Sequence, residues 1–236
     1  MKYSIVIPCF NEEKSIKSLV NSCDHLLSKK NIEILFVDNG STDHTYKTLK
    51  KSLKEKKNYQ ILKIEKNKGY GYGILFGLKH TKGSYIGWTH ADLQTNPNDI
   101  LKAISIIEKN GQNIFVKGLR YGRSFQDNFF TFGMSVLETI LFRKLLYDIN
   151  AQPTMFSRDF YNRFKNPPLD FSLDLYVFYF AHIKKQKIIR FRTYFKKRKF
   201  GSSSWNFGFF SKTKFIKRTL QYSFKLKKSS NENSNS

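Results

Sequence analysis

The chain has 236 residues, of which 42 are Lys or Arg and 18 are Asp or Glu, so its formal net charge is +24. An apolar fraction of 40% and an aromatic fraction of 16% exclude an intrinsically disordered chain, and two cysteines exclude a disulfide scaffold. No apolar run reaches the roughly 18 residues that a membrane span needs, and the N-terminus is not that of a signal peptide. These features predict a protein that stays in the cytoplasm. The charge predicts a polyanionic partner: nucleic acid, an anionic membrane surface or a phosphorylated substrate.

The first half of the sequence alternates apolar, β-branched runs with segments of helical periodicity. The runs predict strands over 4–10, 32–38, 59–65 and 84–92. The segments that follow them predict helices over 12–27, 45–53, 73–80 and 97–109. Strict alternation of this kind predicts an α/β fold, with a mostly parallel central sheet and helices on both faces. Such a sheet binds its ligands beyond the carboxyl ends of the strands.

The second half of the sequence is less regular and becomes strongly basic. It predicts strands over 113–120 and 187–195 and helices over 131–146 and 173–183. No Asp or Glu occurs between Leu175 and Asn231. We therefore expect a catalytic domain over 1–204, a basic aromatic segment over 205–228 and a disordered low-complexity tail over 229–236.

Six short motifs follow one another in an order that resembles family 2 glycosyltransferases of the GT-A fold. They read VIPCFNEE, VDNGSTD, EKNKGYGYGI, HADLQTNP, INAQPTMFSRDF and KKRKFGSSSW. The resemblance covers about residues 3–205, and the last two motifs resemble the dolichyl-phosphate mannose synthase branch, which makes polyprenyl-phosphate sugars. It implies a Rossmann-like GT-A fold and an inverting hexosyltransferase. The implied reaction moves a sugar from a nucleotide diphosphate sugar to dolichyl or undecaprenyl phosphate.

The resemblance assigns a set of residues near the predicted strand ends to the nucleotide sugar, which is GDP-mannose or a UDP-sugar. These are Pro8, Asn11, Glu12, Asp38, Asn39, Lys68, Gly69, Ala91 and Asp92. Asn39 replaces the second Asp of the usual Asp-Asp-Gly-Ser, a change that keeps an acceptor oxygen. Lys68 and Gly69 open a glycine-rich helix start, where backbone N–H groups favour phosphate. From the residues alone, Asp38 could equally be a capping residue and the glycine-rich stretch a loop without a ligand.

Asp92 and Gln94 are the candidate ligands of a divalent cation, Mg²⁺ or Mn²⁺. They correspond to the end of the family's Asp-x-Asp motif, and the resemblance also makes Asp92 a catalytic residue. Both ions prefer oxygen ligands and keep several waters, so a carboxylate and an amide oxygen can suffice beside a diphosphate. His90 replaces the first Asp of the motif. Either His90 binds the metal, which would favour Mn²⁺, or it only lines the donor site, and we favour the second interpretation.

The resemblance places a phosphate-binding set on the acceptor side. Its members are Arg120, Ser135, Gln152, Arg198 and Ser203. The two arginines are also expected to be catalytic, because the guanidinium fork can donate two parallel hydrogen bonds to phosphate. Two positions depart from the family pattern, since Thr131 stands in place of an Arg and Ser204 in place of a Lys. Arg123 or Lys199 can supply the missing charge. The alternative for any one of these cations is a solvated surface charge.

The kind of acceptor determines whether the reaction needs a general base. A sugar hydroxyl must lose a proton as it attacks, whereas a phosphomonoester is already largely dianionic near pH 7. The sequence has many cations and no obvious acidic pair near the acceptor motifs, which favours a phosphate acceptor. Asp148 could orient the acceptor or the sugar, whereas Asp174 could be a helix cap or a buried partner for an Arg.

Three other functions stay open from the sequence. The first is transfer to a sugar hydroxyl in polysaccharide or cell-envelope glycan synthesis. The second is a glycosyltransferase-like protein without activity. The third is a basic nucleic-acid-binding protein, which we disfavour because the basic quarter lacks any recognised nucleic-acid-binding motif.

The segment 205–228 is expected to be an amphipathic element on an anionic membrane surface. Trp205, Phe209, Ile216 and Leu220 fall roughly on one helical face, and seven Lys or Arg residues supply charge. Each cation near anionic lipid contributes about 1 kcal/mol, so several can hold a protein peripherally on the inner face of the membrane. The alternative packs these aromatic residues onto the catalytic domain. Whether an integral membrane partner is required stays open.

Overall fold

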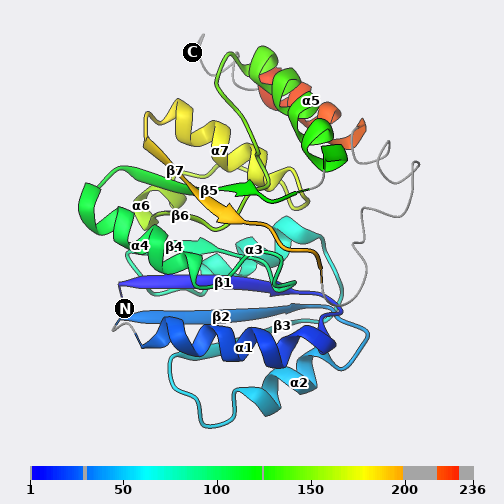
Figure 1. The fold of residues 1–236 in the computed structure, drawn as a ribbon, viewed down its shortest axis with the longest axis vertical. Coiled ribbons are helices and arrows are strands. Elements are labelled where there is room, and N and C mark those ends of the chain that lie inside the picture. Colours follow the sequence, from blue (N-terminus) through cyan, green and yellow to red (C-terminus); the bar gives the residue numbers. More distant parts are fainter. Residues whose placement is uncertain (1, 29–30, 124, 199–216, 229–236) are drawn as a thin grey trace.

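The computed structural model describes residues 2–28, 31–123, 125–198 and 217–228, without the side chains of 125–130. A seven-stranded sheet runs through the described residues and carries helices on both faces (Figure 1). The strands are β1 (Tyr3–Cys9), β2 (Ile32–Asn39), β3 (Tyr59–Ile64), β4 (Tyr85–Trp88), β5 (Ile114–Tyr121), β6 (Thr154–Ser157) and β7 (Lys187–Tyr194). The helices are α1 (Glu13–Leu27), α2 (Thr45–Ser52), α3 (Tyr70–Lys79), α4 (Asp99–Asn110), α5 (Phe125–Phe142), α6 (Arg158–Tyr161) and α7 (Leu173–Ile183). Residues 217–228 form a further helix.

The sheet has the order β3-β2-β1-β4-β6-β5-β7, and β6 alone among these strands runs antiparallel to its neighbours. The α/β fold with a mostly parallel sheet, predicted from the sequence, is therefore confirmed. The sequence pattern does not predict β6, because a strand of four residues is too short for a period to be recognised. This strand matters for the site, since it joins the β1–β4 half of the sheet to β5 and β7.

Two buried clusters cover the two faces of the sheet. Alternating side chains of β1 divide between them: Ile5 and Ile7 pack toward α1, α2 and α4, whereas Val6 packs toward α3 and α7. Helix α3 lies especially close to the sheet at Gly77, where a Cβ atom would come within 2.4 Å of Val6 Cγ1. These contacts hold the carboxyl ends of β1, β2 and β4 in one row.

Three predicted elements differ most from the structure. The helix expected from residue 73 begins at Tyr70, directly after Gly69, whose φ of 106° an L side chain rarely adopts. The strand expected to reach residue 92 ends at Trp88, so the HADLQ motif lies in a loop. The helix expected over 131–146 begins earlier, at Phe125, and ends at Phe142, because Arg143 adopts a left-handed φ of 51°.

The helix over 217–228 packs beside α5, above the sheet in the view of Figure 1. Ser223 Oγ donates a hydrogen bond of 2.7 Å to Glu138 Oε1 of α5, and Tyr222 and Leu226 contact the buried cluster on the α7 side. The packing alternative therefore describes this half of the basic segment. The predictions for Ser203, for 205–216 and for the tail 229–236 fall outside the described residues. Among the helices that the structure does describe, none is long and apolar enough to cross a membrane.

Candidate active site

The residues assigned to the nucleotide lie where β1 and β2 end side by side. In the parallel register, Pro8 is opposite Val37 and Cys9 is opposite Asp38. The Asp38 carboxylate is 1% exposed and accepts a hydrogen bond from the backbone N–H of Ser41. The structure therefore brings the first two motifs together as the sequence predicted.

The glycine-rich stretch makes close contacts with neighbouring segments. The backbone N–H of Gly69 donates to Asn67 Oδ1 at 2.8 Å, and its carbonyl accepts from Nδ2 of the buried Asn39 at 2.9 Å. A Cβ atom on Gly71 would lie 2.6 Å from the carbonyl oxygen of Pro168. The glycines thus permit close packing of α3 against β2 and the loop before α7. The stretch opens a helix as predicted, and the role of Lys68 and Gly69 in phosphate binding stays a prediction.

Asp92 and Gln94 lie in the loop after β4, next to the chain that leaves β7. Asp92 Oδ1 accepts the backbone N–H of Gln94 at 3.1 Å. Gln94 Nε2 donates to the carbonyl of Lys196 at 3.2 Å, which leaves the Gln94 amide oxygen for a cation. Within the described residues, no three His, Cys, Asp or Glu side chains form a metal-binding group. A carboxylate and an amide oxygen fit Mg²⁺ or Mn²⁺ only if a diphosphate and water complete the shell.

Arg198 and Glu12 form an ion pair that joins the predicted acceptor side to the predicted nucleotide side. Burial raises the pKa of Glu12, and Arg198 offsets part of this rise. Arg198 therefore contacts a residue that we assigned to the donor, which sequence spacing alone did not indicate.

His90 lies between the predicted nucleotide side and the predicted acceptor side of the site. Its ring packs against Tyr70 with centroids 5.6 Å apart. Burial lowers the pKa of His90, while Asp92 and Asp174 act to raise it and Arg120 and Arg198 to lower it. Charges from both sides of the predicted site therefore act on one imidazole.

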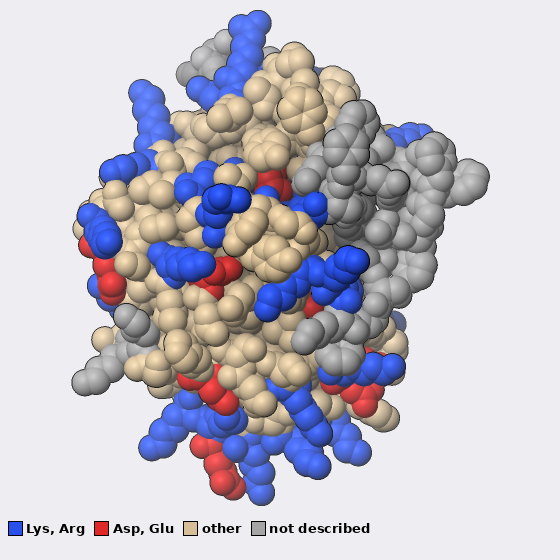
Figure 2. Space-filling model, viewed as in Figure 1, with Lys and Arg blue, Asp and Glu red and all other residues tan. Residues whose placement is uncertain are grey.

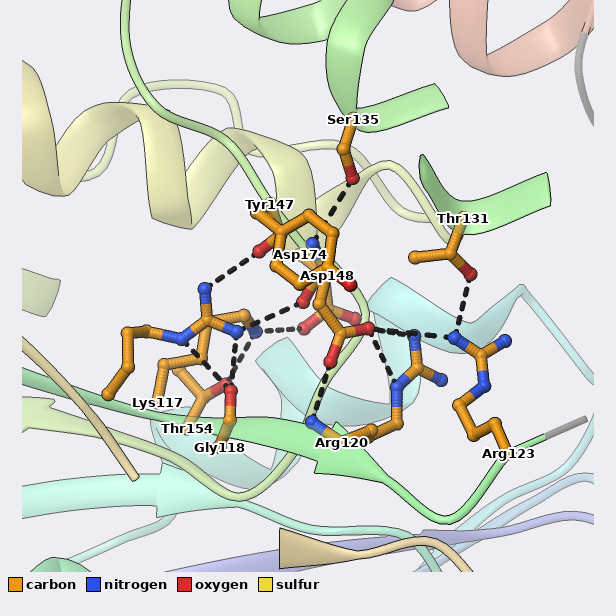
Figure 3. Close-up of polar contacts among 11 residues, drawn as sticks. Lys117, Gly118, Arg120, Arg123, Thr131, Ser135, Tyr147, Asp148, Thr154 and Asp174 are labelled. Carbon is orange, nitrogen blue, oxygen red and sulfur yellow. Dashed lines mark hydrogen bonds and ion pairs between the residues drawn. The ribbon is translucent and has the colours of Figure 1, made fainter. Parts of the chain in front are cut away.

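Asp148 holds the acceptor-side residues together (Figure 3). Its carboxylate accepts the Arg120 backbone N–H at 2.7 Å and Nε at 2.8 Å, and lies 3.8 Å from Arg123 Nη1. Its own N–H donates to Ser135 Oγ at 3.2 Å. Burial opposes ionisation of Asp148, but the pKa is lowered overall because Arg120 and Arg190 favour the carboxylate. Asp148 is thus a carboxylate shared by several arginines.

Arg123 lies beside Thr131, the residue that replaces an Arg of the family motif. Its Nη1 donates to Thr131 Oγ1 at 2.7 Å, so a guanidinium contacts the residue that replaces the expected Arg. Arg123 is therefore placed to act as the substitute cation, whereas Lys199 lies outside the described residues.

A second buried ion pair lies behind Asp148. Lys117 Nζ contacts Asp174 Oδ1 at 3.3 Å and Thr154 Oγ1 at 2.9 Å, and both charged side chains are at most 2% exposed. Burial lowers the pKa of Lys117 to about 8. Asp174 is therefore a buried partner of a Lys, whereas the sequence suggested an Arg. The sequence offered one signal for each of these two cations, since Lys117 directly follows the apolar run 114–116 and Arg190 the apolar pair 188–189.

A small cleft opens beside this cluster, between α5, the start of α7 and the helix over 217–228. Its lining residues are Arg120, Thr131, Met134, Ser135, Glu138, Ile149, Asn150, Phe171, Ser172, Leu175 and Thr219. The predicted acceptor residues Arg120 and Ser135 form its polar end. Gln152, in contrast, is 1% exposed, lies outside this set of lining residues, and donates to the Tyr70 hydroxyl. Gln152 therefore orients Tyr70, and its direct role in acceptor binding stays a prediction.

The buried Glu138 of this cleft makes stability depend on pH. Burial raises its pKa from 4.5 to about 7, so the folded chain keeps a proton that the unfolded chain releases. The folded state binds more protons between these values, and its stability falls as the pH rises through the same window. We expect the free energy of unfolding in urea to fall by at least about 1 kcal/mol from pH 5 to pH 8. Glu138→Gln should remove most of this dependence, and an unchanged pH profile would contradict the assignment.

Comparison with known proteins identifies the family. The model of "Glycosyl transferase family 2" matches residues 4–157. The chain belongs to glycosyl transferase family 2. Among curated relatives of this glycosyltransferase, dolichol-phosphate mannosyltransferase of Pyrococcus furiosus is 35% identical over 51% of the chain. Undecaprenyl-phosphate 4-deoxy-4-formamido-L-arabinose transferase of Proteus mirabilis is 32% identical over 46% of the chain. Each match covers 34% of the relative, so the chain matches about a third of the length of these relatives.

Solved structures confirm the GT-A fold of this family 2 glycosyltransferase. Glucosyl-3-phosphoglycerate synthase from Mycobacterium tuberculosis, in complex with Mn²⁺, UDP-glucose and phosphoglyceric acid, gives a TM-score of 0.72 at 18% identity. That match covers 94% of this chain and 79% of the synthase. A mannosyltransferase from Pyrobaculum calidifontis, in complex with GDP-mannose and Mn²⁺, gives 0.66 at 16% identity over 85% of this chain and 58% of its own.

Proposed function

We propose that this glycosyltransferase moves a hexose from a nucleotide diphosphate sugar to a polyprenyl phosphate, with inversion at the anomeric carbon. The names of the curated relatives support a lipid phosphate as the acceptor, since they specify dolichol phosphate and undecaprenyl phosphate. The structural neighbours bind UDP-glucose or GDP-mannose, which supports a nucleotide diphosphate sugar as the donor.

The observation that carries this proposal is the basic character of the polar end of the cleft. Among the described side chains there, four basic groups lie around two carboxylates. The members of this cluster are Lys117, Arg120, Arg123, Arg190, Asp148 and Asp174. Guanidinium groups bind phosphate through charge-assisted hydrogen bonds, and a phosphomonoester carries about −1.5 to −2 near pH 7. A neutral sugar hydroxyl would interact with these cations more weakly.

The chemistry needs positioning and charge neutralisation rather than a general base. An acceptor phosphate oxygen forms the new bond to the anomeric carbon as the bond to the nucleotide diphosphate breaks. Arg120 and Ser135 at the polar end of the cleft bind the attacking phosphate and orient it, while Asp38 and Asn11 contribute to nucleotide binding. Bringing two anions together is the main barrier, and fixed guanidinium groups lower it.

Asp92 and the Gln94 amide oxygen would hold a Mg²⁺ or Mn²⁺ ion against the donor diphosphate. Bound there, the ion would neutralise the charge that develops on the leaving diphosphate. Carboxylate and amide oxygens are ligands that these ions accept, and the structural neighbours contain Mn²⁺ or Mg²⁺.

The proposal is tested by incubating the protein with radiolabelled nucleotide sugars and undecaprenyl or dolichyl phosphate, with Mg²⁺ or Mn²⁺. We expect organic-phase counts for one donor, which identifies donor and acceptor together. If label appears only in water-soluble glycan, the acceptor is a sugar hydroxyl and the proposal is wrong. If donor is neither transferred nor hydrolysed in any combination, the protein is an inactive relative.

We further propose that α5 contributes to a peripheral membrane surface. Its exposed side includes Phe132, Val136, Leu137 and Ile140, of which Ile140 is 72% exposed. Exposed cations lie nearby in sequence at 143–144 and on the helix over 217–228. Figure 2 shows mostly uncharged atoms over the α5 end of the molecule and dense Lys and Arg at the α1–α2 end. An apolar face beside cations is typical of an interfacial helix, and it would bring the cleft to a lipid acceptor.

Ile140→Asp should weaken sedimentation with anionic liposomes about tenfold, because an exposed side chain that enters the lipid would become charged. The matched control is Ile183→Asp, which changes a 42% exposed Ile at the end of α7. Point substitutions are preferable to truncation after residue 204, because truncation would remove the helix that packs on α5. Equal liposome binding by wild type and Ile140→Asp would rule out this face.

A further inference from the structure

Arg120 and Arg123 share a second contact besides Asp148. Both guanidinium groups lie against the ring of Phe195, with their central carbons 5.2 and 5.5 Å from its centroid. Phe195 directly follows β7, and its backbone N–H donates to the Tyr121 carbonyl at 2.9 Å. This backbone bond fixes the ring between the end of β5 and the arginine pair.

The two contacts restrain the guanidinium groups in complementary ways. A carboxylate accepts hydrogen bonds from the N–H groups of a guanidinium, whereas an aromatic ring attracts the cation over its own face. Asp148 accepts hydrogen bonds from Nε and Nη2 of Arg120, and the ring centroid of Phe195 lies 5.2 Å from the central carbon of Arg120. The two contacts together restrain the Arg120 guanidinium at the polar end of the cleft.

The residues after Phe195 reach the other half of the site. Lys196 N–H donates to the Gln94 carbonyl at 2.7 Å, and Arg198 pairs with Glu12. Phe195, Lys196 and Arg198 therefore contact the acceptor arginines, the candidate metal loop and the nucleotide side in turn. Phe195 is the member of this segment that lies against the arginines.

We infer that Phe195 and Asp148 are positioning residues that fix the paired guanidinium groups of Arg120 and Arg123 for a phosphate dianion. This inference rests on the proposed function, because it concerns the orientation of the acceptor phosphate. Neither residue needs to touch the substrate. Their loss should impair use of the acceptor while nucleotide-sugar binding is retained.

The decisive comparison is Phe195→Leu with Phe195→Tyr. Leu keeps an apolar side chain but removes the aromatic face, whereas Tyr retains it. With undecaprenyl phosphate and the labelled nucleotide sugar of highest turnover, kcat/KM for the lipid should fall about tenfold in Phe195→Leu. It should stay within threefold of wild type in Phe195→Tyr. Calorimetric affinity for the nucleoside diphosphate should not change. Tyr194→Leu, which removes the neighbouring exposed ring, is the matched control.

Asp148→Asn gives an independent test that leaves Phe195 intact. Loss of one carboxylate raises the net charge of the cluster, so the KM for undecaprenyl phosphate should not increase. The kcat should nevertheless fall at least tenfold, because the arginines lose their common anchor. Thermal unfolding identifies any variant that is unfolded at the assay temperature. The variants that stay folded then test whether Phe195 and Asp148 position the arginines.

Two results would overturn the inference if wild type does transfer sugar to the lipid phosphate, so that the proposed function stands. In the first, kcat/KM of Phe195→Leu for the lipid stays within twofold of wild type. In the second, Phe195→Leu and Phe195→Tyr lose kcat/KM equally. Absence of lipid transfer by wild type would instead contradict the proposed function itself.

Discussion

Asp92→Asn should lower the rate of sugar transfer about 1000-fold while the protein stays folded. Asp92 is a half-buried carboxylate in the loop after β4, and its Oδ1 accepts the Gln94 N–H. The variant keeps the size of the side chain but removes the negative charge that would bind the cation beside the diphosphate. Loss of one such electrostatic contact commonly costs several kcal/mol of transition-state stabilisation.

Single-turnover transfer at saturating Mg²⁺ or Mn²⁺ measures this loss, and urea unfolding checks the fold. Asp170→Asn is the matched control, because Asp170 forms a partly exposed ion pair with Arg218. A rate for Asp92→Asn within tenfold of wild type would remove Asp92 from the catalytic set.

Arg120→Lys should lower kcat/KM for the lipid phosphate about 100-fold and leave nucleotide affinity within twofold. The substitution keeps the positive charge but cannot reproduce the planar fork. Arg120 binds Asp148 through its backbone N–H and guanidinium and also lines the cleft, so a Lys would lose both the anchor and the geometry.

The matched control for this prediction is Arg192→Lys. Arg192 is exposed and lies over the ring of Tyr121, with 4.5 Å between its central carbon and the centroid. Acceptor kinetics and calorimetry with the nucleoside diphosphate separate the two effects. If nucleotide affinity collapsed in Arg120→Lys while acceptor KM held steady, Arg120 would belong to the donor site.

The strand-end residues were predictable because periodicity locates buried strands, and parallel strands end at the same edge. Asp38 lies near the end of β2 and Asp92 in the loop after β4, and both of these strands pair with β1. The order of the motifs also indicated family 2 glycosyltransferases, and the family comparison confirms this over residues 4–157.

The buried pairs were not predictable, because their partners are far apart in the sequence. Lys117 and Asp174 are 57 positions apart, and Arg198 and Glu12 are 186 apart. No local pattern records which of many cations meets which carboxylate. A Lys inside the apolar run of β5 was the available signal, since a fully buried charge requires a partner.

Gln152 illustrates a different limit of sequence reasoning. A polar residue in an acceptor-like motif suggested direct acceptor binding, yet its side chain is buried against Tyr70. Polarity and motif position do not distinguish a residue that contacts substrate from one that orients a neighbour.

The central claim is that the acceptor is a phosphomonoester held by the cationic cluster. Transfer to undecaprenyl phosphate should be compared directly with transfer to undecaprenol and to a soluble glycan, across pH 5 to 8, using the donor of highest turnover. The account predicts transfer to the phosphate alone, with acceptor kcat/KM rising through about pH 6 as the phosphate becomes a dianion. Equally efficient transfer to the glycan or to undecaprenol would contradict it.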